Sequence, residues 1–287
     1  MKLSIVIAAH NAASTIGQQL EALAAQQWSE RWEVVVVNNG STDDTADVAS
    51  RFRGRIPNLR IIEASDRQGA AYAANAGARH AGGESLAFCD ADDVVADGWV
   101  AAMGNALAEH QFVAGPLETA HLNTGKLQRY RVSPQSSGIQ QYTYPPYLPH
   151  AAGANMGVRR AVFDRLGGFD ESMQALQDTD FCWRAQLSGI ELVSAPNAIV
   201  HYRFRDTVTG LLKQAFSYAF YNVVIYKKYR AQGMPKLALK HGVASWVGLL
   251  LGITRLMRPE TRALWLWDAG WLSGRLYASI KNRVLAL

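Results

Sequence analysis

The sequence has few cysteines, little charge and no long uninterrupted apolar run. Its two cysteines, Cys89 and Cys182, are too few for a disulfide framework or a zinc knuckle, which favours a reduced, intracellular compartment. Only 18% of the 287 residues are charged, but 49% are hydrophobic, so the chain is not of the disordered class. Its nine prolines and 24 glycines exclude collagen-like and low-complexity proteins.

Neither apolar stretch that could be taken for a membrane or targeting segment is long enough. The most apolar late stretch, residues 243–254, is shorter than the roughly 20 residues that cross a bilayer. Residues 3–9 follow Met1-Lys2 as in a signal peptide, but His10-Asn11 interrupts them. We therefore expect residues 3–9 to be a buried strand and predict no transmembrane segment.

Charge is distributed unevenly along the chain. Residues 207–287 contain twelve Lys and Arg but only Glu260 and Asp268, whereas residues 1–206 contain 17 basic and 22 acidic residues. The basic pI of about 9.2 thus comes from the C-terminal part alone. A nucleic-acid binder with a basic main body is disfavoured, and the basic C-terminal part needs a separate explanation.

Strand and helix patterns alternate over the first two hundred residues. Apolar, β-branched runs predict strands at 3–9, 33–37, 59–63 and 85–89, and helical patterns lie between them. Ser14 or Thr15 is expected to cap the first helix and Thr42 the second. This order predicts an α/β fold with a mainly parallel sheet flanked by helices, in which ligands bind at the carboxyl edge of the strands. Residues 115–150, rich in Gly, Pro, Ser and Tyr, are expected to form a functional or disordered loop.

The densest group of carboxylates, Asp90-Ala91-Asp92-Asp93, follows the fourth predicted strand. Oxygen ligands of this kind suit a hard cation such as Mg²⁺ or Mn²⁺, particularly one shared with phosphate. The alternative is an acidic turn that caps the next helix, a role that we expect of Asp93 or Asp97. Capping would not require Asp90 and Asp92 as well, so we favour the metal interpretation.

A second acidic segment opens a predicted helix at 178–188. Asp180 and Arg184 are four residues apart and are expected to form a structural ion pair. Asp178 has no such partner, which makes it a candidate general base; the alternative is an acidic residue stabilised by the helix dipole. His201, in a predicted strand at 199–203, is a candidate metal ligand if that strand converges with the aspartates.

Residues 3–206 resemble the family 2 glycosyltransferases of the GT-A fold. The resemblance is carried by six segments in a specific order: SIVIAAHN (4–11), VVVNNGSTD (35–43), AANAG (73–77), FCDADD (88–93), GGFDE (167–171) and DTDFCWR (178–184). It implies a catalytic domain at 1–206, and the helical pattern that follows predicts a C-terminal α-helical appendage at 207–287. It also implies transfer of a sugar, with inversion, from a nucleotide-diphosphate donor to a hydroxyl acceptor.

The resemblance assigns roles to individual residues. It implies Asp178 as the catalytic base and Gly153 and Asn155 on the acceptor side. It places Asp92, Asp90 and His201 as candidate ligands of a divalent cation, Mg²⁺ or Mn²⁺. The donor, with a UDP group favoured and GDP or dTDP as alternatives, would be bound by Ala8, His10, Asn39, Arg67, Asp90 and Ala91.

The sequence departs from the family pattern at several of these positions. The family usually has Pro and Tyr where this chain has Ala8 and His10, and Glu where it has Gln177. It commonly has an acidic residue at position 39, where the Asn39 carbonyl can still accept a hydrogen bond but carries no charge.

The C-terminal part is helical in pattern, basic and rich in tryptophan. Aromatic and cationic residues beside apolar stretches suit a helix lying in a membrane interface, which would bring the active site to a lipid-linked acceptor. The alternatives are packing on the catalytic domain or a homodimer contact. The corresponding location is the cytoplasm, with attachment to the inner face of the plasma membrane, in cell-envelope or glycan biosynthesis.

Two other functions fit part of the sequence. The DxDx(T/V) signature of aspartate-nucleophile phosphatases matches Asp90 to Val94, but in those enzymes it usually ends the first strand, whereas three predicted strands precede it here. A non-catalytic sugar-nucleotide binder or scaffold is suggested by Asn39 and Gln177, although Asp92 and Asp178 are both retained.

Overall fold

The computed structural model describes residues 1–286 apart from 126–127, 129–130, 132, 134 and 144, and within them seven strands form one sheet. The strand order is β3-β2-β1-β4-β8-β6-β9. The bounds are β1 Leu3–Ala9, β2 Trp32–Asn38, β3 Arg60–Glu63, β4 Ser85–Asp90, β6 Phe112–Ala114, β8 Met156–Arg159 and β9 Val193–Ser194. All pairs are parallel except those of β8, which runs antiparallel to both β4 and β6. The predicted α/β fold with a mainly parallel sheet is confirmed.

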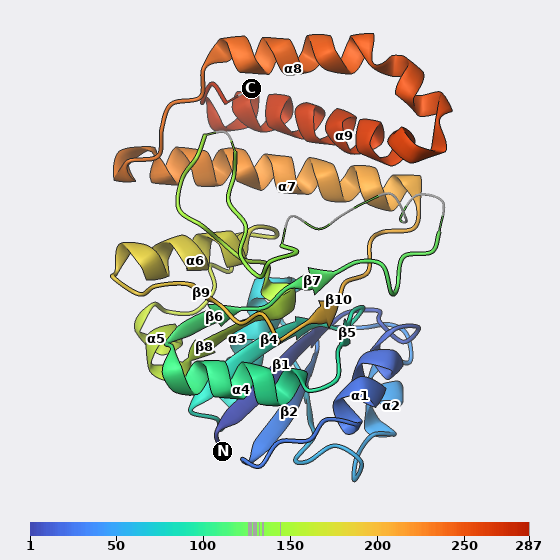
Figure 1. Cartoon of the computed structure of the whole chain (residues 1–287), viewed down its shortest axis with the longest axis vertical. Coiled ribbons are helices and arrows are strands. Elements are labelled where there is room, and N and C mark those ends of the chain that lie inside the picture. Colours follow the sequence, from blue (N-terminus) through green and yellow to red (C-terminus); the bar gives the residue numbers. More distant parts are fainter. Residues whose placement is uncertain (126–127, 129–130, 132, 134, 144, 287) are drawn as a thin grey trace.

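Helices cover both faces of this sheet (Figure 1). Leu3, Ile5 and Ile7 of β1 point to the face covered by α1 (Ile16–Ala24) and α4 (Trp99–Glu109). Val6, on the opposite face, packs against α3 (Ala70–His80), where a Cβ on Gly77 would lie only 2.4 Å from Val6 Cγ1. The alternating apolar pattern therefore splits into two hydrophobic cores, one on each side of β1.

A smaller sheet of order β5-β10-β7 lies beside the end of β4. It consists of β5 (Val94–Val95), β10 (Val200–His201) and β7 (Leu117–Glu118). In it His201 pairs with Val94. The predicted strand at 199–203 is thus shorter than expected, but it does converge with the aspartate segment. Among the described residues of the 115–150 segment, the β-structure consists of β7 and an isolated bridge between Gln140 and His150.

Three long C-terminal helices lie on one side of the sheet domain. They are α7 (Val208–Tyr229), α8 (Leu239–Leu251) and α9 (Pro259–Asn282), with short 3-10 turns at η2 (Arg230–Gln232) and η3 (Ile253–Met257). Figure 1 shows them stacked with α7 nearest the sheet, then α9, then α8. The helices α7 and α9 approach closely, since a Cβ on Gly274 would lie 2.5 Å from the carbonyl oxygen of Phe216. The predicted C-terminal helical part is present, and the division at residue 206 stays a prediction.

Several predicted helix starts differ from the observed ones. The helix α2 (Thr45–Ser50) begins three residues after Thr42, because Asp43 Oδ1 accepts hydrogen bonds from the N–H and hydroxyl of Thr45. Thr15 does precede α1, but its side chain makes no capping hydrogen bond. The expectation that Asp93 or Asp97 caps α4 is wrong: Gly98, in the left-handed conformation, precedes α4 without a side-chain cap.

Candidate active site

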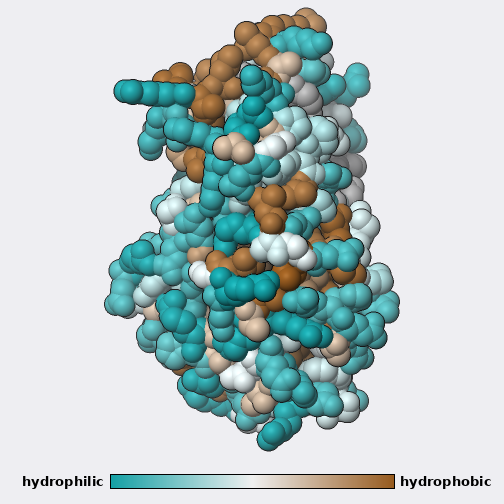
Figure 2. Space-filling model, turned by 90° about the vertical axis from the view of Figure 1, so that its left-hand side faces the viewer, coloured by the Kyte–Doolittle hydropathy of each residue, from teal (hydrophilic) through white to brown (hydrophobic). Residues whose placement is uncertain are grey.

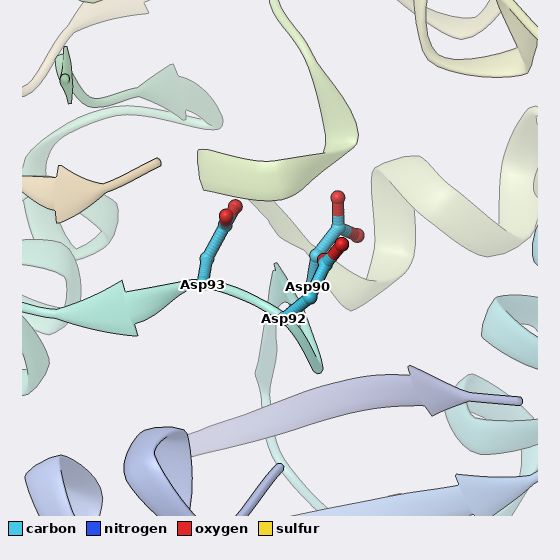
Figure 3. A group of neighbouring side chains, drawn as sticks. All are labelled: Asp90, Asp92 and Asp93. Carbon is cyan, nitrogen blue, oxygen red and sulfur yellow. The ribbon is translucent and has the colours of Figure 1, made fainter. Parts of the chain in front are cut away.

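The three aspartates at the end of β4 form one cluster. Single ligand atoms of Asp90, Asp92 and Asp93 all lie within 4.8 Å of one another. In Figure 3 the three side chains project to the same side of the turn between β4 and β5, with Asp90 and Asp92 side by side. The cluster lies at the carboxyl edge, since Ala8, near the end of β1, pairs with Asp90. This is where the sequence predicts ligand binding.

Charge repulsion and burial both act on this cluster. Desolvation by the surrounding protein, together with the charges of Asp92 and Asp178, raises the pKa of Asp90 to about 7, although the residue is partly open to solvent. Burial and the charges of Asp92 and Asp90 raise the pKa of Asp93, which is fully buried. Asp93 Oδ1 accepts a hydrogen bond from the Arg203 N–H at 2.8 Å, but Oδ2 has no partner within the described part of the chain. A buried carboxylate oxygen without a donor or cation is costly.

These features fit a divalent cation. Three carboxylates supply hard oxygen ligands, and the unpartnered Asp93 Oδ2 is a further acceptor in the same cluster. Asp93 was predicted only as a helix cap, and the structure instead brings it into the candidate metal group. Asp92 Oδ2 forms an ion pair with Arg205 Nη1 at 3.1 Å.

His201, the fourth candidate ligand, lies outside the aspartate cluster. Its Nδ1 is 2.7 Å from Glu118 Oε2, and its ring is 4.4 Å from that of His121. A carboxylate on one ring nitrogen is the usual arrangement for a histidine that binds a metal through the other. Glu118 was not identified from the sequence, because β7 and β10 are joined only in the folded chain.

Asp178 is the second residue of α6 (Gln177–Leu187) and is half-buried. Its Oδ2 accepts a 2.8 Å hydrogen bond from the N–H of Gly153, in η1 (Gly153–Asn155), and its Oδ1 accepts one from the Thr179 N–H. Burial raises the pKa of Asp178 despite these bonds. Because the charge of Asp178 also raises the pKa of Asp90, the two carboxylates act on the same region of the structure.

Asp180 has a different role from Asp178, as predicted. It is fully buried and pairs with Arg184 at 2.8 Å and with Lys228 of α7 at 2.7 Å. The hydroxyl of Tyr229 donates to its Oδ1 at 2.9 Å. The DTD segment thus contains one carboxylate that holds α6 against α7 and one that faces the cluster at the end of β4.

The residues predicted to bind the donor nucleotide lie along the same edge. Ala8 is half-buried and Ala91 is buried, while His10 is exposed and its Nδ1 lies 2.9 Å from the Asn39 carbonyl oxygen. The Asn39 side chain donates to the carbonyl oxygens of Ala64 and Arg67. It also accepts from the Gly69 N–H at 2.8 Å. Asn39 therefore holds the 64–69 loop.

Two predicted residues are engaged within the protein. The guanidinium of Arg67 pairs with Glu171 of the GGFDE segment and lies 4.9 Å from the Tyr72 ring. Asn155, predicted to lie on the acceptor side, is fully buried. Its side chain donates to the carbonyl oxygens of Pro116 and Ala198 and accepts from Trp99 Nε1. The residue of η1 that contacts Asp178 is Gly153, through its backbone N–H.

Several residues that sequence reasoning missed lie around the site. Arg203 and Arg205 lie just beyond the end of β10. Two cationic residues close together after a strand were the feature of the sequence that could have identified them. Tyr218 of α7 is close enough to Asp178 and Asp90 that, in addition to burial, their charges raise its pKa. No feature of the sequence connects a tyrosine in a C-terminal helix with these aspartates.

Two family models and several relatives match this chain. Residues 4–167 match the family described as Glycosyl transferase family 2, and residues 87–277 match Glycosyl transferase family group 2. The uncharacterized glycosyltransferase YwdF of Bacillus subtilis is 26% identical over 293 residues, which cover 97% of this chain and 100% of the relative. The glycosyltransferase AglE of Haloferax volcanii is 28% identical over 201 residues, 69% of this chain and 65% of the relative.

Two solved structures share the fold. A mannosyltransferase from Pyrobaculum calidifontis, in complex with GDP-Man and Mn²⁺, superposes with a TM-score of 0.63 at 18% identity, covering 96% of this chain and 87% of the other. TarS of S. aureus, in complex with UDP, superposes with a TM-score of 0.58 at 17% identity, covering 99% and 92%. At these identities the likeness concerns the fold.

Proposed function

The chain belongs to glycosyltransferase family 2, and from this premise we propose that it is an inverting enzyme that moves a sugar from a nucleotide-diphosphate donor to a hydroxyl group. Membership of the family and the GT-A fold make it a transferase. The inverting stereochemistry, the identity of the donor and the requirement for a metal ion are the parts that we propose.

One observation carries the mechanism. Asp178, at the start of α6, accepts a hydrogen bond from Gly153 of η1, and η1 leads directly into β8, the strand that pairs with β4. The charge of Asp178 also raises the pKa of Asp90, at the end of β4, so a base and a metal-binding cluster act on the same region. The two groups come from different parts of the fold, which leaves each free for a separate role. Such a pair is what transfer between a diphosphate donor and an alcohol requires.

We propose that the nucleotide lies along the carboxyl edge of β1 and β2. Ala8 and Ala91 would border it, and His10 would offer a ring nitrogen at its exposed position. Asn39 would act by holding the 64–69 loop that carries Arg67. A UDP group is favoured, with GDP or dTDP as alternatives; solved proteins of this fold hold UDP in one case and GDP-Man with Mn²⁺ in another.

Mg²⁺ or Mn²⁺ would be held by Asp92 and Asp90, together with Asp93 and with His201 as a further ligand. When bound, such a cation supplies a Lewis acid that offsets the negative charge of the departing nucleoside diphosphate. Arg205, already beside Asp92, adds a second positive charge at the same place. In the protein itself, the positive charge of Arg205 partly offsets the negative charge of the three carboxylates.

Asp178 takes the proton in the transfer step. Its carboxylate accepts the proton of the acceptor hydroxyl as that oxygen attacks the anomeric carbon, on the face opposite the diphosphate. The bond to the diphosphate oxygen breaks with its electron pair, so the configuration inverts. The raised pKa makes Asp178 a stronger base than an ordinary aspartate, and general-base catalysis of this kind contributes about 10²- to 10⁴-fold.

The acceptor would approach past Gly153, whose N–H fixes Asp178 Oδ2. Its class is a hydroxyl of a glycan, a lipid-linked sugar or a small molecule. Both cysteines are free and buried, in keeping with the proposed cytoplasmic location and a role in cell-envelope or glycan biosynthesis.

The proposal is tested by measuring donor turnover with UDP-, GDP- and dTDP-sugars, with and without Mn²⁺, for the wild type and for Asp178→Asn. We expect cation-dependent turnover of one donor class by the wild type and its loss in the variant. Hydrolysis of phosphate esters without any need for a sugar nucleotide would instead indicate the phosphatase alternative. Tight donor binding with no turnover would indicate the non-catalytic binder.

A further inference from the structure

The outermost helix of the C-terminal part, α8, exposes its large apolar side chains. Of its thirteen residues only Gly242 is buried, although the helix is mostly apolar. Leu250 and Leu251 are 66% and 80% exposed, and Met257 in η3 is 80% exposed. Together with these, the exposed apolar residues of the segment form what we call the α8 patch: Leu239, Val243, Val247, Leu250, Leu251, Ile253 and Met257.

Within the described part of the chain, the side chains of the α8 patch are between 48% and 80% exposed. Its helical residues recur at intervals of three and four, so they share one face. The opposite face carries small residues: Gly242, Ser245 and Gly248 line a cavity of about 420 Å³ between α8 and α9. The contact across it includes a 3.0 Å hydrogen bond from Trp265 Nε1 to the Leu249 carbonyl oxygen. A helix packed only for stability would have the reverse arrangement.

The charged residues near the α8 patch are mostly positive. Residues 236–264 contain five Lys and Arg and one acidic residue, Glu260. Lys240 lies within α8, and Arg258 and Arg262 follow it at the start of α9, whereas Arg255 of η3 lines the cavity between α8 and α9. An exposed apolar face bordered by cations is the pattern of a helix that lies in the headgroup region of an anionic bilayer.

We propose that the α8 patch docks on the surface of a membrane containing anionic lipids. A second copy of the chain is a poorer occupant, because a symmetric contact would bring two such basic segments together. Spanning is also excluded for α8, since thirteen residues reach only about 20 Å, and among the described residues no helix has the length and apolar run to cross a bilayer.

The position of α8 in the fold agrees with this. It is the layer farthest from the sheet in Figure 1, and Figure 2 shows hydrophobic residues gathered at that end of the molecule beside hydrophilic ones. The active-site residues lie beyond α9 and α7, so a membrane under α8 would leave them open to a donor in solution. The proposal goes beyond the transfer reaction and does not depend on it.

The experiment is co-sedimentation of the full chain with vesicles of phosphatidylcholine, alone or mixed with phosphatidylglycerol. We expect binding to the mixed vesicles, weakened by salt, and much weaker binding to phosphatidylcholine alone. Leu250→Gln/Leu251→Gln should lower the partition coefficient by about tenfold or more, and Lys240→Glu/Arg258→Glu should do so mainly on the anionic vesicles. Both pairs are exposed, so thermal unfolding should be unchanged.

Matched controls lie on the sheet domain. Leu187→Gln removes an apolar side chain that is 47% exposed, and Arg51→Glu/Arg53→Glu reverses two exposed charges. Neither should alter vesicle binding. The proposal fails if the wild type does not bind, or if the controls reduce binding as much as the α8 variants. It also fails if light scattering shows a dimer that Leu250→Gln/Leu251→Gln dissociates.

Discussion

The N–H of Gly153 donates a 2.8 Å hydrogen bond to Oδ2 of Asp178, the candidate base. An asparagine at position 178 can still accept from Gly153 through its one oxygen, and it loses only the bond from the Thr179 N–H in the first turn of α6, so Asp178→Asn should still fold. It cannot take up a proton, and we expect turnover to fall by about 10²- to 10⁴-fold with little change in the Kd of the donor. Single-turnover kinetics and donor titration check both expectations; a variant that keeps more than half the wild-type rate would remove Asp178 from the base role.

The neighbouring Asp180→Asn variant should behave in the opposite way. It leaves Arg184 and Lys228 without their buried partner, so we expect a loss of about 2 kcal/mol or more in the free energy of unfolding. The fraction that remains folded should keep its turnover. Denaturant unfolding of the two variants side by side distinguishes the catalytic carboxylate from the structural one.

The raised pKa of Asp178 predicts the pH dependence of turnover. The carboxylate is active and its protonated form is not, so the rate should be lost as the pH falls through this pKa. Because burial raises the pKa above 3.8, the acid limb of kcat at saturating Mn²⁺ should lie at higher pH than for an exposed aspartate. The residual rate of Asp178→Asn should lack this limb, and an identical limb in that variant would assign it to another group.

A divalent cation should stabilise the protein through the aspartate cluster. At about 100 times its Kd, Mn²⁺ should add roughly 2.7 kcal/mol to the free energy of unfolding. Asp92→Asn and Asp93→Asn should each reduce the Mn²⁺-induced rise in Tm. The exposed Asp97→Asn, four residues after Asp93, is the matched control and should keep the full rise. An undiminished rise in Asp93→Asn would exclude Asp93 as a ligand.

The local sequence pattern predicted the bounds of the four parallel strands β1 to β4 well. The predicted strands at 3–9, 33–37, 59–63 and 85–89 agree with β1 to β4 within one residue at each end. Each is an apolar run that ends in polar turn residues, so burial on both faces and the turn chemistry specify the same bounds. The carboxyl edge, and with it the positions of Asp90 and Asp92, followed from these strands alone.

Contacts between distant residues were beyond such reasoning. In the sequence Asp93 resembles a helix cap, but in the structure it is buried and accepts a hydrogen bond from the N–H of Arg203, 110 residues away. The ion pair of Arg205 with Asp92 spans 113 residues. The resemblance assigned Asn39 to the donor and Asn155 to the acceptor side, but it gave no indication that their amides hold backbone segments that only the folded chain brings near them. The positions of such polar side chains depend on tertiary packing, which the local sequence pattern does not predict.

Replacing Asn39 by the acidic residue common at this position tests whether its amide holds the 64–69 loop. In Asn39→Asp the carbonyl oxygens of Ala64 and Arg67 lose their donor and face a carboxylate, so we expect a loss of about 2 kcal/mol, or roughly 4–8 °C in Tm, and weaker nucleotide binding. The control is Asn105→Asp, whose side-chain oxygen only accepts from Trp28 Nε1, so an aspartate there keeps the bond. If Asn39→Asp proved as stable as this control and bound nucleotide as tightly as the wild type, the amide donors would be dispensable, and the loop would be held by the Gly69 N–H contact and its own packing.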